Sequence, residues 1–274
     1  MTGHVLGVEA RPRSGGWIST SAQAFFALME RDLRVLRREL IPFVARTAMQ
    51  PFLFVFVFAY VQPKIGQGNR GFGDILVPGL LASAIVLQGI QAVAIPLVQE
   101  FSQTKEIEDR VMAPMPVWGV AVQKIVFAMA QSLLAAVVVF PLVYTIPLDK
   151  PDLHIRPLVL LTVVPLGAVL SASLGLLIGT TVNPRQIALV FALIVIPLTF
   201  LGAVYYPWDK LEAIRWLQFV TLINPLVYMS EGLRAALTPQ YGHMNYFGVY
   251  GGLLAGCTAC LYFGIRGFVR RVQS

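Results

Sequence analysis

The amino-acid sequence predicts an all-α integral membrane protein with six transmembrane helices, and three observations lead to this prediction. Of its 274 residues, 57% are hydrophobic and 13% are charged, whereas soluble domains have about 25% charged residues. The mean hydropathy is +0.71. Six stretches stay apolar for about 18 residues or more, which is the helical length that crosses a hydrocarbon core about 30 Å thick.

The chain begins with two segments that are too polar to span a membrane. Residues 1–16 contain Pro, Gly and Arg and little that can be buried, so we predict a flexible cytoplasmic tail. Residues 17–40 set apolar side chains along one stripe, as in an amphipathic helix at the membrane interface. Its arginines fall largely elsewhere: Arg31, Arg34, Arg37 and Arg38. These arginines would meet anionic lipid headgroups or a soluble partner, and the sequence leaves both interpretations open.

The transmembrane domain is predicted at residues 41–266. Its six spans are expected at residues 42–62, 75–98, 117–147, 157–181, 187–204 and 246–265. The segment 205–240 is too apolar for a solvated loop and is interrupted by prolines, which predicts short re-entrant helices at the outer face. Residues 267–274 are expected to form a cytoplasmic C-terminal tail.

The net charge of +7 is explained by orientation in a membrane, and we predict no nucleic-acid partner. With the N-terminus in the cytoplasm, thirteen of the 21 Lys and Arg residues lie in inner segments, seven lie in outer ones, and Arg46 lies in the first span. Cytoplasmic loops of membrane proteins carry an excess of Lys and Arg. Both termini are therefore predicted to be cytoplasmic.

Small residues recur every four positions in two of the predicted spans, which places them on one face of each helix: Ser171, Gly175 and Gly179, then Gly248, Gly252 and Gly256. Such a face lets two helix backbones approach closely. The neighbouring helix can belong to the same chain or to a second subunit, and the sequence does not decide between them.

No catalytic or metal-binding constellation is visible in the sequence. A GxxxxGK[ST] phosphate loop is absent, so any ATP must be bound by another polypeptide. The histidines His4, His154 and His243 are dispersed, and no HExxH motif occurs. We predict that the chain by itself is not an enzyme and binds no metal or other cofactor.

One charged segment stands between the second and third spans. Six charges fall within eleven residues: Glu100, Lys105, Glu106, Glu108, Asp109 and Arg110. Residues 99–112 contain good helix formers and no proline, and Pro114 and Pro116 then end the run. The pattern predicts a short helix across the cytoplasmic mouth of the bundle, with a solvated loop as the alternative.

The sequence IEDRVMAPMP at 107–116 resembles the segment that follows the second span in ABC-2 type exporter permeases, the membrane subunits of ATP-binding-cassette transporters. The chain keeps Ile107, Glu108 and Pro114 of that pattern, but it has Lys105 and Glu106 where the family often has Gly and Thr. The resemblance extends over most of residues 20–270, through DILVPGLLASAIV, PLTFLGAVYYPWDKL and LINPLVYMSEGLR.

This resemblance implies a coupling helix at about 99–112 that docks on a nucleotide-binding subunit. It also implies two copies of that ATPase subunit, which would bind ATP and Mg, and a second copy of the permease in a homodimer. The residues expected to contact the ATPase are Glu100, Lys105, Glu106, Glu108, Arg110, Arg31 and Arg34. The expected location is a bacterial inner membrane.

The expected function is export of an amphiphilic molecule: a drug-like compound, a lipid or a lipid-linked glycan. Four aromatic residues are candidates to line its pathway, with lipid-facing or core positions as the alternative: Phe54, Phe58, Phe191 and Phe200. Three other functions stay open. They are an ion-coupled secondary transporter, a lipid-modifying membrane enzyme and a membrane anchor for a soluble protein.

Overall fold

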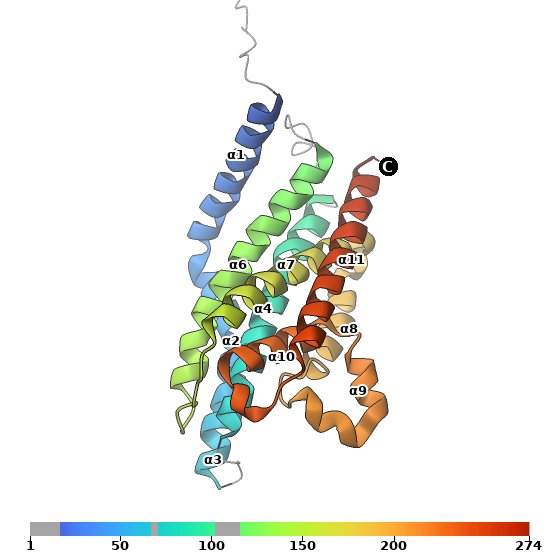
Figure 1. The fold of residues 1–274 in the computed structure, drawn as a ribbon. Coiled ribbons are helices and arrows are strands. Elements are labelled where there is room, and N and C mark those ends of the chain that lie inside the picture. The colour runs from blue at the N-terminus through green and yellow to red at the C-terminus, as the bar shows by residue number, and fades with distance from the viewer. Residues whose placement is uncertain (1–16, 67–70, 102–115, 274) are drawn as a thin grey trace, which may run out of the picture.

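The computed structural model describes residues 17–66, 71–101 and 116–273, and this part of the chain contains helices and no strands (Figure 1). The long helices are α1 (Trp17–Arg38), α2 (Leu40–Val55), α4 (Phe72–Gln99), α6 (Val117–Thr145), α7 (Pro157–Thr181), α8 (Ile187–Phe200), α10 (Pro225–Leu237) and α11 (Tyr246–Gln273). The short ones are η1 (Phe56–Val61), α3 (Gln62–Lys64), η3 (Pro184–Gln186), η4 (Trp208–Ile214), α9 (Arg215–Thr221) and η5 (Pro239–Tyr241).

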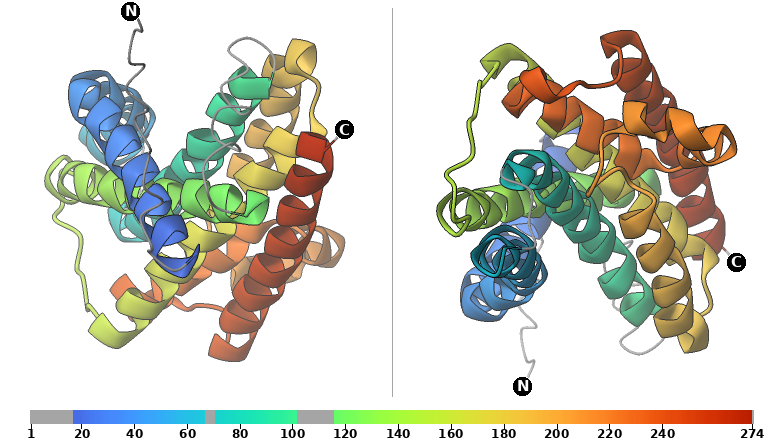
Figure 2. Two further views of the ribbon diagram at one scale, coloured as in Figure 1. Left: turned by 90° about the horizontal axis from the view of Figure 1, so that it is seen from above. Right: turned by 90° about the horizontal axis from the view of Figure 1, so that it is seen from below.

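The bundle has two distinct ends. The start of α1, the end of α4 and the end of α11 lie at the upper end in Figure 1, whereas α3, α9 and the turn after α10 lie at the opposite end. We call the upper end the inner end, because the sequence predicts that it is cytoplasmic. Figure 2 shows α1 and α2 on one flank of the bundle and α11 on the other.

Helix α4 forms the centre of the bundle and contacts α6, α7 and α10. Glycines allow these helices to approach closely. A Cβ atom on Gly79 would lie 2.0 Å from the carbonyl oxygen of Val204, and one on Gly175 would lie 2.6 Å from that of Ile90. Since real Cβ atoms do not come so near, the close approach of the segment after α8 to α4, and that of α7 to α4, depend on glycine.

The small-residue stripes predicted from the sequence pack within the chain where the structure describes them. Gly175 and Gly179 of α7 face α4, and Gly252 of α11 faces the ring of Tyr228 in α10. These three glycines therefore serve intramolecular packing, which was one of the two open interpretations.

Among the described residues, five helices are long and apolar enough to cross a membrane: Leu40–Lys64, Phe72–Gln99, Val117–Thr145, Pro157–Thr181 and Tyr246–Gln273. The predicted fifth span is shorter than expected. Helix α8 has 14 residues, and a helix of that length covers only about 21 Å of a hydrocarbon core about 30 Å thick. The all-α membrane fold is confirmed, and the sixth crossing stays a prediction.

The connection between α8 and α11 is broken at the prolines that the sequence singled out. Pro207 directly precedes η4, while Pro225 and Pro239 occupy the first positions of α10 and η5. Proline suits the first turn of a helix because the N–H group it lacks would have no partner there. Re-entry of these short helices into the membrane stays a prediction.

Two terminal elements also differ in extent from the expectation. Helix α1 lies within the predicted amphipathic segment 17–40 and contacts α6, while its location at a membrane interface stays a prediction. Helix α11 continues beyond residue 265 to Gln273, so residues 267–273 of the expected tail are helical. Phe268 in this extension is fully buried and joins a second apolar core at the inner end.

Candidate functional site

The predicted coupling helix at 99–112 falls largely on residues 102–115, which lie outside the described residues. Four predicted contact residues are therefore not placed: Lys105, Glu106, Glu108 and Arg110. Gln99 closes α4, and Glu100 and Phe101 follow it within the described part. The structure thus describes the point at which this segment leaves the bundle.

Glu100 is held at this point by a buried ion pair. Its carboxylate lies 2.6 Å from the Nζ atom of Lys124 in α6, and both side chains are more than nine-tenths buried. A buried carboxylate of this kind needs its partner, because removing either charge leaves the other one uncompensated. Glu100 therefore ties the end of α4 to α6, and its direct contact with an ATPase stays a prediction.

Phe101 is held from the other side by α11. The guanidinium of Arg271 lies 4.7 Å from the centre of the Phe101 ring, and the ring of Phe268 lies 6.2 Å away. Arg271 also donates hydrogen bonds to the last carbonyl groups of α7, at 2.7 Å to Thr180 and 3.2 Å to Gly179. The root of the charged segment is therefore connected to α6, α7 and α11.

The arginines of α1 do not form one cluster. Arg34 pairs with Glu30 at 2.6 Å on the exposed surface, whereas Arg31 lines a cavity between α1 and the bundle. Asp32 accepts a hydrogen bond of 3.0 Å from Gln123, a fully buried residue of α6. This bond attaches α1 to the bundle one residue away from Arg31.

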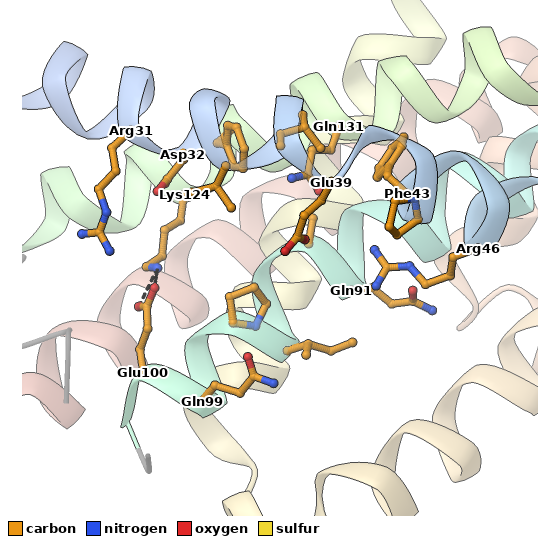
Figure 3. Close-up of a pocket in the computed structure, with 17 residues that line it drawn as sticks. Arg31, Asp32, Glu39, Phe43, Arg46, Gln91, Gln99, Glu100, Lys124 and Gln131 are labelled. Atoms are coloured by element: carbon orange, nitrogen blue, oxygen red, sulfur yellow. Dashed lines mark hydrogen bonds and ion pairs between the residues drawn. The ribbon is translucent and has the colours of Figure 1, made fainter. Parts of the chain in front are cut away.

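The cavity has a volume of about 760 Å³ and lies at the inner end, between α1, α2, α4 and α6 (Figure 3). Its wall includes three basic and three acidic side chains: Arg31, Arg46, Lys124, Asp32, Glu39 and Glu100. Ligand pockets in proteins commonly have volumes of about 300–1,000 Å³. The cavity is thus large enough for a small molecule or for the polar part of a larger one.

A chain of amides continues from this cavity between the helices. Gln131 of α6 lines the cavity and accepts a hydrogen bond of 3.1 Å from Gln88 of α4. Gln88 in turn accepts one of 3.3 Å from the hydroxyl of Thr47 in α2. Since hydrogen-bonded amides inside a membrane protein link helices to one another, this chain joins the three helices next to the cavity.

The predicted pathway aromatics come together in part. The rings of Phe54 and Phe58 are stacked at 5.8 Å, and Tyr205 lies 5.2 Å from Phe54 and 5.9 Å from Phe200. These rings join α2 to the end of α8. Phe191 packs against the same main core as Phe54 and Phe58, but it has no ring contact with this aromatic cluster among the described residues.

A buried ion pair near the opposite end of the bundle was not predicted from the sequence. Glu231 and Arg234 of α10 are fully buried and paired with each other. Glu231 accepts hydrogen bonds from the backbone N–H groups of Trp208 at 2.9 Å and Met244 at 2.8 Å. Arg234 donates one of 3.0 Å to the carbonyl of Ala203. The available signal was an acid and a base three residues apart in an apolar segment.

A second polar contact at this end involves Tyr241, whose hydroxyl donates a hydrogen bond to the buried carboxylate of Asp74. Asp74 also accepts a bond of 2.9 Å from the backbone of Asp152. The hydrogen bond to Asp74, followed by burial, raises the pKa of Tyr241 to about 12. Asp74 therefore connects the start of α4 with the segments before α7 and α11.

A model of the family described as ABC-2 type transporter matches residues 23–238, which include the cavity and the buried ion pair of α10. The chain belongs to the ABC-2 type transporter family. This ABC-2 permease is also similar to the inner membrane transport permease YadH of Escherichia coli K12, with 28% identity over 210 residues that cover 75% of the chain and 78% of YadH. YadH of Shigella flexneri matches it with the same identity and coverage.

Membership identifies the chain as the membrane permease of a transport system. An ATPase partner is implied by the family, and no finding indicates an enzymatic activity of the permease itself. The five candidate spans agree with a multi-pass membrane protein. The comparisons leave the cargo and the direction of transport open.

Proposed function

We propose that the chain is the transmembrane subunit of an ABC exporter in a bacterial inner membrane, with six spans and both termini in the cytoplasm. Two copies would form a homodimer that binds two ATPase subunits, and these would bind ATP and Mg. The cargo would be an amphiphile: a drug-like compound, a lipid or a lipid-linked glycan. Family membership supports the transport role, and the similarity to YadH, a protein named as an inner membrane permease, supports the location.

The proposed coupling element is the segment at about 99–112. The observation that carries this proposal is the attachment of its root: Glu100 pairs with Lys124 of α6, and Phe101 contacts Arg271 of α11. Because Arg271 is bonded to the end of α7, a displacement of this root is passed to three helices at once. ATP binding by the partner could then favour one conformation of the bundle, provided that the cargo interacts differently with the two conformations.

The buried acids that the structure describes do not favour an ion-coupled secondary transporter. Asp74, Glu100 and Glu231 each have a hydrogen-bond or ion-pair partner within the described chain. Proton-coupled transporters instead rely on acidic or histidine residues that change their charge within the membrane. An ATP-driven mechanism is therefore the better supported of the two.

The experiment has two stages. The tagged chain is purified from membranes in mild detergent, and the protein that accompanies it is tested for nucleotide binding. The charge reversals Glu108→Lys and Arg110→Glu are then compared with Lys210→Glu, which changes an exposed charge near the opposite end. We expect the first two variants to lose most of the bound ATPase and the third to retain it. Retention by all three would contradict the coupling assignment, as would transport by the isolated chain.

A further inference from the structure

We propose that the inner-end cavity binds the headgroup of a zwitterionic amphiphile that carries a phosphate and a terminal amine, with Arg46 contacting the phosphate and Glu39 contacting the amine. The chemistry is that of phosphatidylethanolamine. The binding site follows from geometry alone, while its position in the cytoplasmic leaflet rests on the proposed function and orientation.

Four of the six charged side chains in the cavity wall have an interaction partner in the protein. Glu100 pairs with Lys124, Asp32 accepts a hydrogen bond from Gln123, and Arg31 also has an interaction partner. The charged wall residues that make no side-chain hydrogen bond or ion pair within the described part of the chain are Glu39 and Arg46. They are one acid and one base, and both are exposed. A ligand that satisfies them must carry both signs of charge.

The spacing of Glu39 and Arg46 leaves room for a ligand between them. Glu39 directly precedes α2 and Arg46 lies within it, so the two residues are about 10 Å apart along the helix axis, and both line the cavity. They do not pair with each other, and Phe43 lies between them in the cavity wall. Figure 3 shows both side chains directed into the same hollow, with the Gln91 side chain next to Arg46. The gap between the two charged groups is therefore open to a dipolar ligand.

The opposite walls of the cavity repeat a pattern of polar, apolar and polar residues. On α4 the series is Gln91, Ile95 and Gln99, and on α6 it is Lys124, Phe127 and Gln131. The Gln91 amide would supply a hydrogen-bond donor beside the phosphate, and the apolar residues of both walls would cover the carbon atoms of the headgroup. The cavity is thus lined by polar and apolar residues in nearly equal number, as suits a ligand that has both charged groups and carbon atoms.

The order of the two charges along the chain determines the direction in which a lipid headgroup would lie in the cavity. Glu39 precedes α2 at the inner end, and Arg46 lies about two turns further into the predicted first span. A phospholipid in the inner leaflet has its phosphate nearer the hydrocarbon and its terminal amine nearer the water. The order of the two charges therefore matches the headgroup. An unpaired arginine within a span is energetically costly, and a lipid phosphate at this depth would compensate its charge.

An apolar groove next to the cavity provides a surface for a hydrocarbon chain. A shallow groove of about 570 Å³ starts at Arg46 and follows one face of α2, lined by Ala45, Met49, Gln50, Leu53 and Phe54. Arg46 belongs to both the cavity and this groove. The groove leads towards the aromatic cluster around Tyr205. An acyl chain that leaves the headgroup cavity at Arg46 would thus meet an apolar surface.

The test measures binding of three phospholipids with identical acyl chains to the purified full-length chain, by native mass spectrometry: phosphatidylethanolamine, phosphatidylcholine and phosphatidylglycerol. We expect phosphatidylethanolamine to bind most tightly, because only its headgroup has both a phosphate and a hydrogen-bonding amine. Arg46→Gln should weaken the binding of both phosphatidylethanolamine and phosphatidylglycerol by about tenfold, the effect of losing a charge-assisted hydrogen bond. Glu39→Gln should weaken the binding of phosphatidylethanolamine by about as much. It should leave the binding of phosphatidylglycerol unchanged or make it tighter.

Matched controls are Glu30→Gln and Arg37→Gln, since both residues are exposed on α1 and neither lines the cavity. These variants should bind all three lipids as the wild type does, and unchanged circular dichroism would show that all four variants are folded. Equal binding of phosphatidylglycerol and phosphatidylethanolamine by the wild type would overturn the zwitterion site. An unchanged affinity in Arg46→Gln or Glu39→Gln would do the same, as would an equal loss in the controls.

A second arm separates cargo from resident lipid. The chain is reconstituted with its ATPase partner in vesicles that contain a fluorescent phosphatidylethanolamine, and movement of the label between leaflets is followed on ATP addition. ATP-dependent movement identifies the bound lipid as cargo, whereas binding without movement identifies a resident lipid, and both results support the headgroup site. Failure to find a nucleotide-binding partner would contradict the proposed function and leave the binding result intact.

Discussion

At the scale of single residues, the main feature is a small number of buried charges that join segments distant in the sequence. Glu231 bonds the backbone at Trp208 and at Met244, and its partner Arg234 bonds the backbone at Ala203. Ala203 has a positive φ of 53°, a conformation that non-glycine residues adopt only when their surroundings hold it. One ion pair thus fixes three irregular backbone segments near the end opposite to the cavity.

Removing Arg234 should therefore lower the stability of the protein much more than removing an exposed charge. Arg234→Met leaves the carboxylate of Glu231 buried without its cation, which costs about 3–5 kcal/mol in comparable buried pairs. We expect the midpoint of thermal unfolding in detergent to fall by on the order of 10 °C. The exposed residue Arg215 provides the control Arg215→Met, which should change the midpoint little. Equal stability of the two variants would show that the pair is dispensable.

The contact between Tyr241 and Asp74 predicts a dependence on pH at the alkaline end. The pKa of Tyr241 is raised to about 12, first by its hydrogen bond to Asp74 and then by burial. Because the neutral phenol is the donor, the stabilisation is complete below the ordinary tyrosine value of about 10 and is lost as the pH rises through the raised pKa. Tyrosinate absorbance of Tyr241→Phe, subtracted from that of the wild type, isolates this titration.

A companion variant tests the cause of the raised pKa. Asp74→Ala removes both the hydrogen-bond acceptor and the carboxylate charge next to Tyr241. The titration assigned to Tyr241 should then move down, towards about 10. If the pKa of Tyr241 stayed at its raised value, burial would be the main cause and the role assigned to Asp74 would be wrong.

At the scale of helices, the packing depends on which helix faces carry small residues. Helix α4 is buried along most of its length because glycines let its neighbours come close. Helix α8 ends where Asn224 donates a hydrogen bond of 2.8 Å to the carbonyl of Leu198, and the same side chain accepts one of 2.9 Å from Leu226 at the start of α10. One asparagine therefore ends one helix and begins another, which explains why α8 is shorter than its apolar run.

Two glycine substitutions separate close packing from helix propensity. Gly175→Ala puts a methyl group against the carbonyl of Ile90, whereas Gly251→Ala meets no atom within 4 Å. We expect Gly175→Ala to destabilise the protein by about 1–3 kcal/mol, as overpacking does. Gly251→Ala should be neutral or stabilising by up to about 1 kcal/mol, because alanine favours helix. Thermal unfolding in detergent measures both, and equal midpoints would contradict the close approach of α4 and α7.

At the scale of the whole molecule, the described chain has two polar ends and exposed apolar flanks. Leu189, Leu193 and Ile196 of α8 are each more than half exposed, as expected for a surface that meets lipid or a second subunit. The segments rich in Lys and Arg gather at the end that carries the cavity. This distribution agrees with the orientation proposed from the positive-inside rule.

The orientation can be tested by labelling single cysteines. In a background with Cys257→Ala and Cys260→Ala, the variants Lys150→Cys and Gln273→Cys place an exposed thiol near opposite ends. In cells whose outer membrane has been made permeable, an impermeant maleimide should label position 150 and reach position 273 only after the inner membrane is broken. The reverse pattern would place the cavity on the outer side and overturn the coupling proposal.

Individual residues show which features could be predicted from the sequence and which could not. Continuous apolar runs determine that the chain is helical and membrane-embedded, because a backbone in hydrocarbon must satisfy its own hydrogen bonds, and prolines determine where the outer helices begin. Pairing across the fold was decided only by the tertiary structure. Lys124 had no visible partner until the bundle brought Glu100 beside it, and the neighbouring charges Glu39 and Arg46 had no common cavity until α4 and α6 closed around them. Hydropathy acts along the chain, whereas an electrostatic contact depends on distance in space.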